Sequence, residues 1–235
     1  MENDNHSIVE NGELRVMERL KAAGFCSTVF DVGANIGEYS IQARRCFPKS
    51  DIYAFEPIRR TYVLLCQNTE GTGIRTFNFG LGDRDESLEF SLLPDALGLA
   101  TAQHSIVRLR SPDAERVREQ CQIRRSGDVA TECGVAEIGL LKIDTEGNDW
   151  FVLHGFEEWL KAGRIKIIQF EYGLFSITTK KLLFDFYELL TSYGYKIGKI
   201  YPTCVDFRDY NPLQEDFIGP NFLGVHESFD SSIFK

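Results

Sequence analysis

The sequence predicts an α/β fold in which helices cover both faces of a mostly parallel sheet. Three observations predict it. Short β-rich runs alternate with segments whose apolar residues recur at helical spacing, and short connections join them. The apolar run at 138–143 has the composition of a central strand that is buried on both faces. The length of 235 residues and the hydrophobic share of 43% suit one large domain of this kind.

The alternation begins in the first third of the chain. We expect helices over 9–23, 36–46 and 61–67, and strands over 28–32, 51–55 and 75–79. Asn35 is placed to cap the second helix, with Glu38 as the reciprocal carboxylate of a capping box. Strands and helices in this order are typical of a parallel sheet.

The alternation resumes after residue 134. We expect strands over 138–143, 165–170, 195–201 and 222–226, and helices over 149–161 and 178–193. The count is about seven strands in one domain, residues 25–235, which a helical extension, residues 1–24, precedes.

Between these two parts the pattern changes. Residues 87–92 alternate between polar and apolar side chains, as a half-exposed strand would, and no long apolar period follows. We interpret about 84–134 as an insertion or lid on the domain; the plain alternative is a solvated helix of mixed charge. The stretch carries six arginines: Arg108, Arg110, Arg116, Arg118, Arg124 and Arg125.

Composition excludes several classes of protein. The formal net charge of -9 argues against a nonspecific nucleic-acid binder, which depends on cationic contacts to phosphate. No stretch approaches the roughly 18 to 20 apolar residues of a membrane helix, and residues 1–13 do not resemble a signal peptide. We therefore expect a cytoplasmic protein with reduced cysteines. The oligomeric state is left open.

The carboxyl ends of the expected strands carry the chemistry. Asp31, Glu56, Asp144 and Glu171 each end or directly follow a strand, and in a parallel α/β sheet ligands bind at that edge. Several carboxylates at one edge would repel one another if they had no ligand. Their grouping indicates a functional site.

The first turn, from Asp31 to Gly37, is the strongest of these signals. Its G-x-x-x-G spacing lacks the middle glycine of the dinucleotide fingerprint, so it suits S-adenosylmethionine better than a pyrophosphate. Asp31 would hold the ammonium group, and Glu56 at the next strand would accept both ribose hydroxyls. An NAD-dependent oxidoreductase stays as the alternative.

Four motifs in order resemble the FkbM-type methyltransferases across residues 28–226. They are Phe30-Asp31-Val32-Gly33-Ala34-Asn35-Ile36-Gly37, Phe55-Glu56-Pro57, Leu141-Lys142-Ile143-Asp144-Thr145-Glu146-Gly147 and Glu171. The resemblance implies a Rossmann-like class I methyltransferase fold, with a seven-stranded sheet whose last strand is antiparallel. It also implies S-adenosyl-L-methionine as cofactor and methylation of an oxygen, commonly a hydroxyl of a sugar, glycan or secondary metabolite.

On that pattern the cofactor site takes residues from several turns. They are Asp31, Gly33, Ala34, Asn35, Gly37, Glu56, Pro57, Asp83 and Asp144. The stretch at 98–128 has no counterpart in the family pattern. Its arginines suggest an anionic acceptor, such as a nucleotide-sugar or a phosphorylated glycan.

A hydroxyl is a poor nucleophile until its proton leaves, so the reaction calls for a base. The candidates are Asp144, Glu146, Glu171 and His104, with His226 and His154 expected to be structural. Alternatively, Asp144 touches the cofactor, Glu146 caps the next helix and Glu171 binds a sugar hydroxyl. We assign no metal, although three carboxylates would offer Mg²⁺ its preferred oxygen ligands. A non-catalytic module that binds the cofactor is the remaining alternative.

Overall fold

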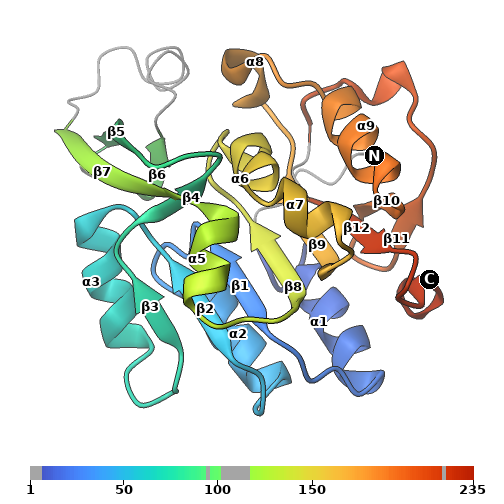
Figure 1. Cartoon of the computed structure of the whole chain (residues 1–235), viewed down its shortest axis with the longest axis horizontal. Helices are drawn as coiled ribbons and strands as arrows, with labels where there is room; N and C mark the ends of the chain where they lie inside the picture. Colours follow the sequence, from blue (N-terminus) through green and yellow to red (C-terminus); the bar gives the residue numbers. More distant parts are fainter. Residues whose placement is uncertain (1–6, 94–95, 102–116, 219–220) are drawn as a thin grey trace.

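The computed structural model describes residues 7–93, 96–101, 117–218 and 221–235, and its core is an eight-stranded sheet (Figure 1). The strand order is β11-β10-β12-β9-β8-β1-β2-β3. The strands are β1 (Val29–Val32), β2 (Ile52–Phe55), β3 (Arg75–Phe77), β8 (Ile138–Ile143), β9 (Ile165–Glu171), β10 (Tyr195–Ile200), β11 (Val205–Phe207) and β12 (Asn221–His226). The order reverses between β1 and β8, which is where ligands bind in open α/β sheets.

The pairing confirms the expected antiparallel strand and corrects the strand count. β12 runs antiparallel to both β9 and β10, whereas β1 is parallel to β2 and to β8. The sheet has eight strands instead of seven, because β11 pairs antiparallel with the edge of β10. The sequence around β11 is polar and rich in proline, and this short strand is held to the sheet by its pairing with β10 and by the buried side chain of Val205.

Helices cover both faces of the sheet, as expected. They are α1 (Glu13–Ala22), α2 (Glu38–Cys46), α3 (Arg59–Asn68), α5 (Ser126–Glu132), α6 (Asp149–Gly155), α7 (Glu157–Lys161), α8 (Ser176–Thr179) and α9 (Leu183–Ser192), with 3₁₀ turns at Pro212–Gln214 and Ser231–Phe234. Alternate residues of β1 enter opposite cores: Phe30 joins residues of α6, α7 and α9, and Val29 joins residues of α1 and α2. The segment expected as an extension therefore packs onto the sheet through α1. No helix in the described parts is long and apolar enough to cross a membrane.

Three helix predictions were wrong in detail. The segment 178–193 is not one helix but the end of α8 followed by α9, with Lys180 at φ +57° between them. The segment 149–161 is two helices that meet at Phe156, and the capping box at Asn35 does not form. Gly37, at φ +92°, is the residue that precedes α2, and Asn35 lies two residues earlier at φ +49°. The backbone N–H of Asn35 bonds instead to Glu56, so the turn between β1 and α2 serves β2 and not the helix.

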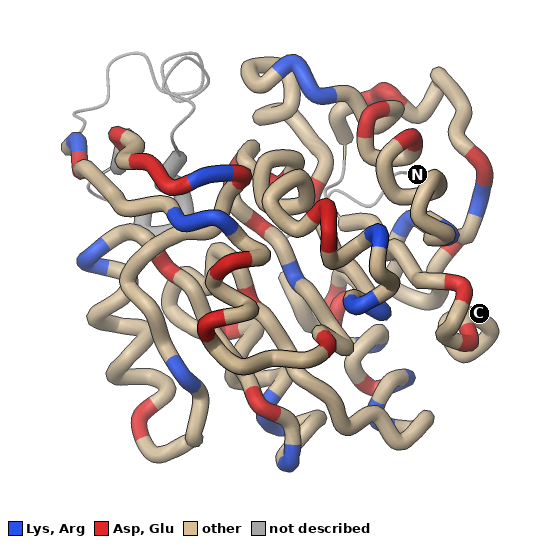
Figure 2. The backbone as a smooth tube through the Cα atoms, viewed as in Figure 1, with Lys and Arg blue, Asp and Glu red and all other residues tan. Residues whose placement is uncertain are grey.

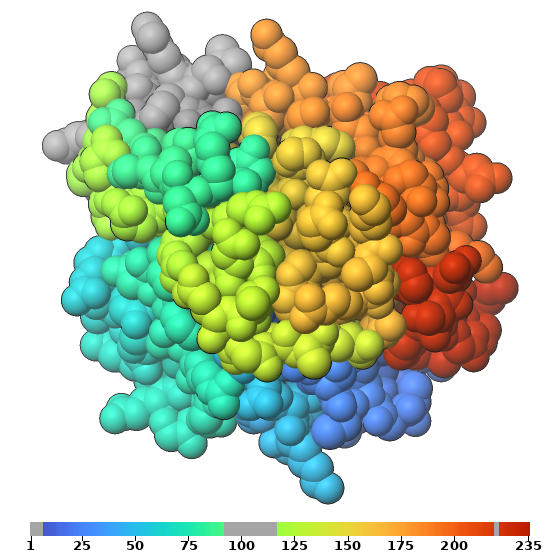
Figure 3. All heavy atoms as spheres, viewed as in Figure 1, coloured from blue at the N-terminus to red at the C-terminus, as the bar shows by residue number. Residues whose placement is uncertain are grey.

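Four strands between Gly80 and Arg125 build a second, smaller sheet. Its strands are β4 (Gly80–Gly82), β5 (Glu86–Leu93), β6 (Ala96–Thr101) and β7 (Val117–Arg125), in the order β4-β7-β5-β6. The solvated helix considered for this stretch is wrong for 117–125, which pair antiparallel with β5. Figure 1 shows the small sheet above α3, at the same end of the molecule as α8. In the space-filling view its atoms continue into those of α5 and α6 without a break (Figure 3).

Candidate active site

The turn after β1 is packed tightly between the ends of β2 and β8. Gly33 has φ +79°, and a Cβ atom added there would lie 1.8 Å from the carbonyl oxygen of Asp144. The N–H groups of Gly33 and Ala34 both donate to the carbonyl of Phe55, at 3.0 Å. Glycine is therefore required at position 33 both by the backbone conformation and by the lack of space.

Glu56 connects this turn to the turn after β2. Its Oε2 accepts from the N–H of Asn35 at 2.9 Å, and its Oε1 accepts from the N–H of Ile58 at 2.9 Å and the hydroxyl of Thr61 at 2.8 Å. Burial raises the pKa of the Glu56 carboxyl, and these hydrogen bonds act against that rise. The two turns that the sequence assigned to the cofactor are thus held together by one carboxylate.

A cavity of about 310 Å³ opens beside these turns, within the size range of ligand sites. Of the residues predicted for the site, Gly33, Asn35, Glu56, Pro57, Asp83, Asp144 and Glu146 line it. Asp31, Ala34, Gly37 and Glu171 are not among its lining residues, and His104 lies outside the described residues.

The cavity wall suits a nucleoside. Ile58, Leu81 and Phe90 supply apolar surface, and Glu56 supplies a charged acceptor. The side-chain oxygen of Asn35 is buried and accepts no hydrogen bond from the described part of the chain. A buried oxygen in that state costs free energy, which a ligand donor at the cavity wall would recover.

Asp31 lies beneath the cavity and is fully buried. Its carboxylate accepts from the hydroxyl of Ser40 at 2.6 Å and pairs with Lys142 at 3.2 Å. Lys142 also donates to the carbonyl of Gly33 at 3.2 Å and pairs with Asp144 at 3.4 Å. The contact of Asp31 with an ammonium group stays a prediction.

Lys142 is a residue that sequence reasoning did not select. Burial alone would lower the pKa of its ammonium group, but the carboxylates of Asp31 and Asp144 outweigh burial and raise it. The two carboxylates therefore favour the charged form of Lys142, which contacts the carbonyl of Gly33. The available signal was a lone charged residue inside the apolar run 138–143.

Asp149 is a second residue that was missed. Its Oδ2 accepts from the hydroxyl of Thr145 at 2.8 Å, and its Oδ1 accepts from the N–H of Glu171 at 3.1 Å. Burial, and then the charge of Asp144, raise the pKa of Asp149 to about 6. Its side chain fixes the ends of β8 and β9 relative to each other. The signal was its place at the start of an expected helix, which conventionally indicates only a helix-dipole contact.

The remaining candidate bases are placed differently from one another. Glu146 has φ +53° and lines the cavity, and α6 begins after Asn148, so Glu146 is not its cap residue. Burial and then the neighbouring carboxylates Asp144 and Glu146 raise the pKa of Glu171 well above its usual range. The described residues contain no group of three His, Cys, Asp or Glu side chains arranged to hold a metal ion.

The histidines that we expected to be structural lie outside the cavity wall. His226 contacts the hydroxyl of Ser228 at 2.8 Å, and His154 lies 3.6 Å from a carboxylate oxygen of Glu157.

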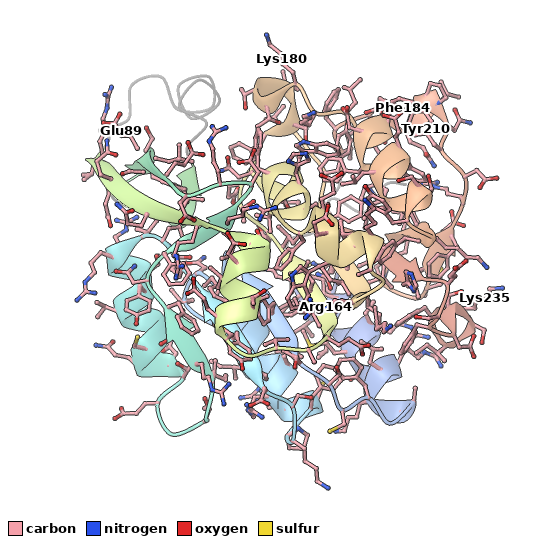
Figure 4. All side chains as sticks on the ribbon, in the orientation of Figure 1. Glu89, Arg164, Lys180, Phe184, Tyr210 and Lys235 are labelled. Atoms are coloured by element: carbon pink, nitrogen blue, oxygen red, sulfur yellow. The ribbon has the colours of Figure 1, made fainter. Side chains whose placement is uncertain are left out.

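The described arginines of the 98–128 stretch pair with carboxylates of the small sheet and of α5. Arg124 lies 2.6 Å from Glu132, and Arg125 lies 3.2 Å from Asp128. Arg118 pairs with Glu89 on the outside of the small sheet, where Figure 4 labels Glu89 and Figure 2 shows charges of both signs. Arg108, Arg110 and Arg116 lie outside the described residues. Arg84 lines the cavity and pairs with Glu86 at 3.2 Å.

Comparison with known families decides among the alternatives. The model of the methyltransferase FkbM domain matches residues 31–197. The chain belongs to the FkbM methyltransferase family. The match confirms the resemblance seen in the four motifs, the class I methyltransferase fold and S-adenosyl-L-methionine as the cofactor. The NAD-dependent alternative is thereby set aside.

Curated relatives of the chain include two methyltransferases that are named for different acceptors. The chain is 34% identical over 158 residues to the 31-O-demethyl-FK506 methyltransferase FkbM of Streptomyces tacrolimicus, a match that covers 55% of this chain and 59% of that protein. It is 29% identical over 159 residues to the hexuronic acid methyltransferase AglP of Haloferax volcanii, covering 66% and 60%. It is 31% identical over 147 residues to methyltransferase 1 of Beauveria bassiana, covering 56% and 59%. Each match spans about three fifths of the relative.

Proposed function

We propose that this chain transfers the methyl group of S-adenosylmethionine to a hydroxyl oxygen of a sugar, glycan or secondary metabolite. One observation carries the proposal: a single cavity is lined by the Gly33 turn, by Glu56 and by the segment from Asp144 to Glu146. Six of the nine residues expected to hold the donor, and two of the candidate bases, therefore face the same volume. Two relatives, named for 31-O-demethyl-FK506 and for a hexuronic acid, support an oxygen acceptor.

The sulfonium of the donor makes its methyl carbon electrophilic, and the protein has to place the acceptor oxygen in line with it. Because Asp144 is already paired with Lys142, we assign to it the orientation of the acceptor hydroxyl. We assign the removal of the proton to Glu146, which lines the cavity beside it. Glu56 and Asn35 then hold the nucleoside part of the donor. A positioned base contributes about 10²- to 10⁴-fold in rate.

Three single amide substitutions test these roles: Asp144→Asn, Glu146→Gln and Glu171→Gln. The turnover number is measured on a panel of hydroxylated glycans and secondary metabolites, and donor affinity is measured separately by calorimetry. We expect Glu146→Gln to lower turnover by about 10²- to 10⁴-fold with donor affinity within about twofold. Glu171, which is not in the cavity wall, is the matched control.

Full turnover in both Asp144→Asn and Glu146→Gln would contradict the carboxylate base. A wild-type protein that binds the donor but methylates nothing in the panel would favour the non-catalytic binding module instead. Each result is compared with the calorimetric affinity, which reports donor binding alone.

The acceptor that we favour is an anionic sugar. A hexuronic acid, the acceptor named for AglP, carries both hydroxyls and a carboxylate. Arg84 lines the cavity with a side chain that is 68% exposed, so its guanidinium is available to an acceptor carboxylate. The sequence suggested an anionic acceptor from the arginines of 98–128; the arginine that lines the cavity is Arg84, which lies outside that stretch.

A further inference from the structure

A network of buried polar side chains connects the segment before α1 with α1, β9 and α2. Asn11 donates to one carboxylate oxygen of Glu13 at 2.6 Å, and Gln169 donates to the other. The hydroxyl of Tyr39 donates to the amide oxygen of Gln169 at 3.2 Å. All four side chains belong to residues that are at most 8% exposed. Within this network Glu13 accepts hydrogen bonds from both Asn11 and Gln169.

At its other end, the polar network contacts the residue that supports the Gly33 turn. The ammonium nitrogen of Lys142 lies 5.4 Å from the centroid of the Tyr39 ring, within the range of a cation–π contact. The same nitrogen pairs with Asp31 at 3.2 Å and donates to the carbonyl of Gly33 at 3.2 Å. The position of the Tyr39 ring therefore affects the position of Lys142, the cation that supports the turn.

The direction of these hydrogen bonds depends on the charge of Glu13. Burial raises the pKa of the Glu13 carboxyl, and its hydrogen bond from Asn11 and the charge of Lys142 act against that rise. In its ionised form the carboxylate only accepts, so the amide of Gln169 turns its NH₂ group toward Glu13 and its oxygen toward Tyr39. The hydroxyl of Tyr39 then has an acceptor. A neutral amide at position 13 would offer its own donors to Gln169 and would remove the reason for that orientation.

We propose that Glu13 is a positioning residue for the methyl donor: through Gln169 and Tyr39 it holds Lys142 against the carbonyl of Gly33. The family domain matches residues 31–197, so in this chain a residue outside that domain completes the support of the donor site. The charge of Glu13 also acts on Lys142 directly, because it is one of three carboxylates whose fields raise the pKa of the lysine. The inference depends on donor binding and not on the nature of the acceptor.

The test compares Glu13→Gln with Glu18→Gln. Both substitutions remove one negative charge from α1 without changing the size of the side chain, and Glu18 is exposed. Calorimetry at 25 °C measures the dissociation constants of S-adenosylmethionine and S-adenosylhomocysteine, and thermal unfolding is followed in parallel. We expect Glu13→Gln to weaken binding of S-adenosylmethionine about 5- to 20-fold, because the substitution removes the contribution of about one to two hydrogen bonds to the support of the donor site. Glu18→Gln should stay within about twofold.

The second ligand separates a positioning role from a purely structural one. S-adenosylhomocysteine lacks the positive charge on sulfur, so the loss of a carboxylate beneath the site should weaken its binding less than that of S-adenosylmethionine. A Glu13→Gln protein that is folded at 25 °C, melts at a lower temperature and binds both ligands as the wild type does would overturn the proposal.

Tyr39→Phe provides the test if Glu13→Gln does not fold. It keeps the ring beneath Lys142 and removes the hydroxyl that bonds to Gln169. We expect a rise of about two- to fivefold in the dissociation constant of S-adenosylmethionine. An unchanged constant would overturn the proposal equally. The proposed function is tested separately on the wild-type protein: donor binding there without any methyl transfer would count against the proposed function and not against this inference.

Discussion

The main sheet and the small sheet meet at the same cavity but are specified by the sequence in different ways. Every residue of β1, β2 and β8 is buried, so these strands are recognisable from their apolar composition alone. In β7 only Cys121 and Ile123 are buried, and the strand exists because it pairs with β5 over seven consecutive residues. Central strands are thus encoded locally, and the strands of the small sheet are encoded by their partner.

The two regions also differ in what they contribute to the cavity. The main sheet supplies backbone turns whose positions are fixed by close contacts, as at Gly33 and Asp144. The small sheet supplies side chains, Leu88, Phe90 and Ile123 among them, and these have rotamers that can adjust. A substitution in the main-sheet turns should therefore cost more than one in the small sheet.

The largest effect is expected for Gly33→Ala. The added methyl group would lie 1.8 Å from the carbonyl oxygen of Asp144, and the backbone at φ +79° disfavours any side chain. Overpacking and this strain together cost about 3 to 5 kcal/mol. We expect donor affinity to fall about 100-fold or more, measured by calorimetry, with a matching loss in urea unfolding.

Gly71→Ala is the matched control for that substitution. Gly71 has a similar backbone conformation, φ +73°, but a Cβ atom there would meet nothing within 4 Å. Strain alone should cost about 1 to 2 kcal/mol of stability and leave donor affinity unchanged. Equal losses of donor affinity in the two variants would show that the Gly33 turn is not held by its contact with Asp144.

The contrast explains which parts of the fold were accessible from the sequence. The order of strands and helices in the main sheet was predictable because a strand that is buried on both faces has a continuous apolar sequence, as in 138–143. In the small sheet, β5 was indicated by the alternation at 87–92, whereas β7 was not predicted, since it depends on pairing between distant residues, such as Leu88 with Cys121. The eighth strand, β11, was missed although it pairs with the neighbouring β10, because it is short and its surroundings are polar and rich in proline.

The residues of the site also differ in how far the sequence predicted them. Glu56 and Gly33 were identifiable because a carboxylate or a glycine directly after a parallel strand is typical of a ligand-binding turn. Lys142, Asp149 and Glu13 were missed because each acts on a partner far along the chain. Gln169, for example, accepts from Tyr39 and donates to Glu13, and no spacing in the sequence relates these three residues.

A second prediction concerns the buried carboxylate that joins β8 to β9. The pKa of Asp149 is about 6 in the folded protein and 3.8 in an ordinary setting. A folded-state pKa above the unfolded value gives stability that is present below the unfolded pKa and is lost as pH rises through the folded pKa. Asp149 should therefore lower the free energy of unfolding by up to about 3 kcal/mol between pH 4 and pH 6.

Asp149→Asn should make that pH slope shallower, as measured by urea unfolding at pH 4, 5, 6 and 7. Asp128 provides the comparison from the small-sheet side, since its side chain is 58% exposed at the start of α5. Asp128→Asn should reproduce the wild-type slope. Parallel slopes in all three proteins would mean that Asp149 is not the group whose ionisation is opposed by burial.

The smallest effect is expected for Arg84→Ala, on the small-sheet side of the cavity. Its side chain is 68% exposed, so water screens its charge and limits any one contact with an acceptor carboxylate. We expect the KM for a hexuronate-bearing acceptor to rise about three- to tenfold, with donor affinity unchanged. Arg124→Ala is the control, because Arg124 is paired with Glu132 and does not line the cavity. Both variants could keep the wild-type KM while Gly33→Ala abolishes donor binding. The small sheet would then supply only the apolar wall against which the donor packs, and the acceptor would bind elsewhere.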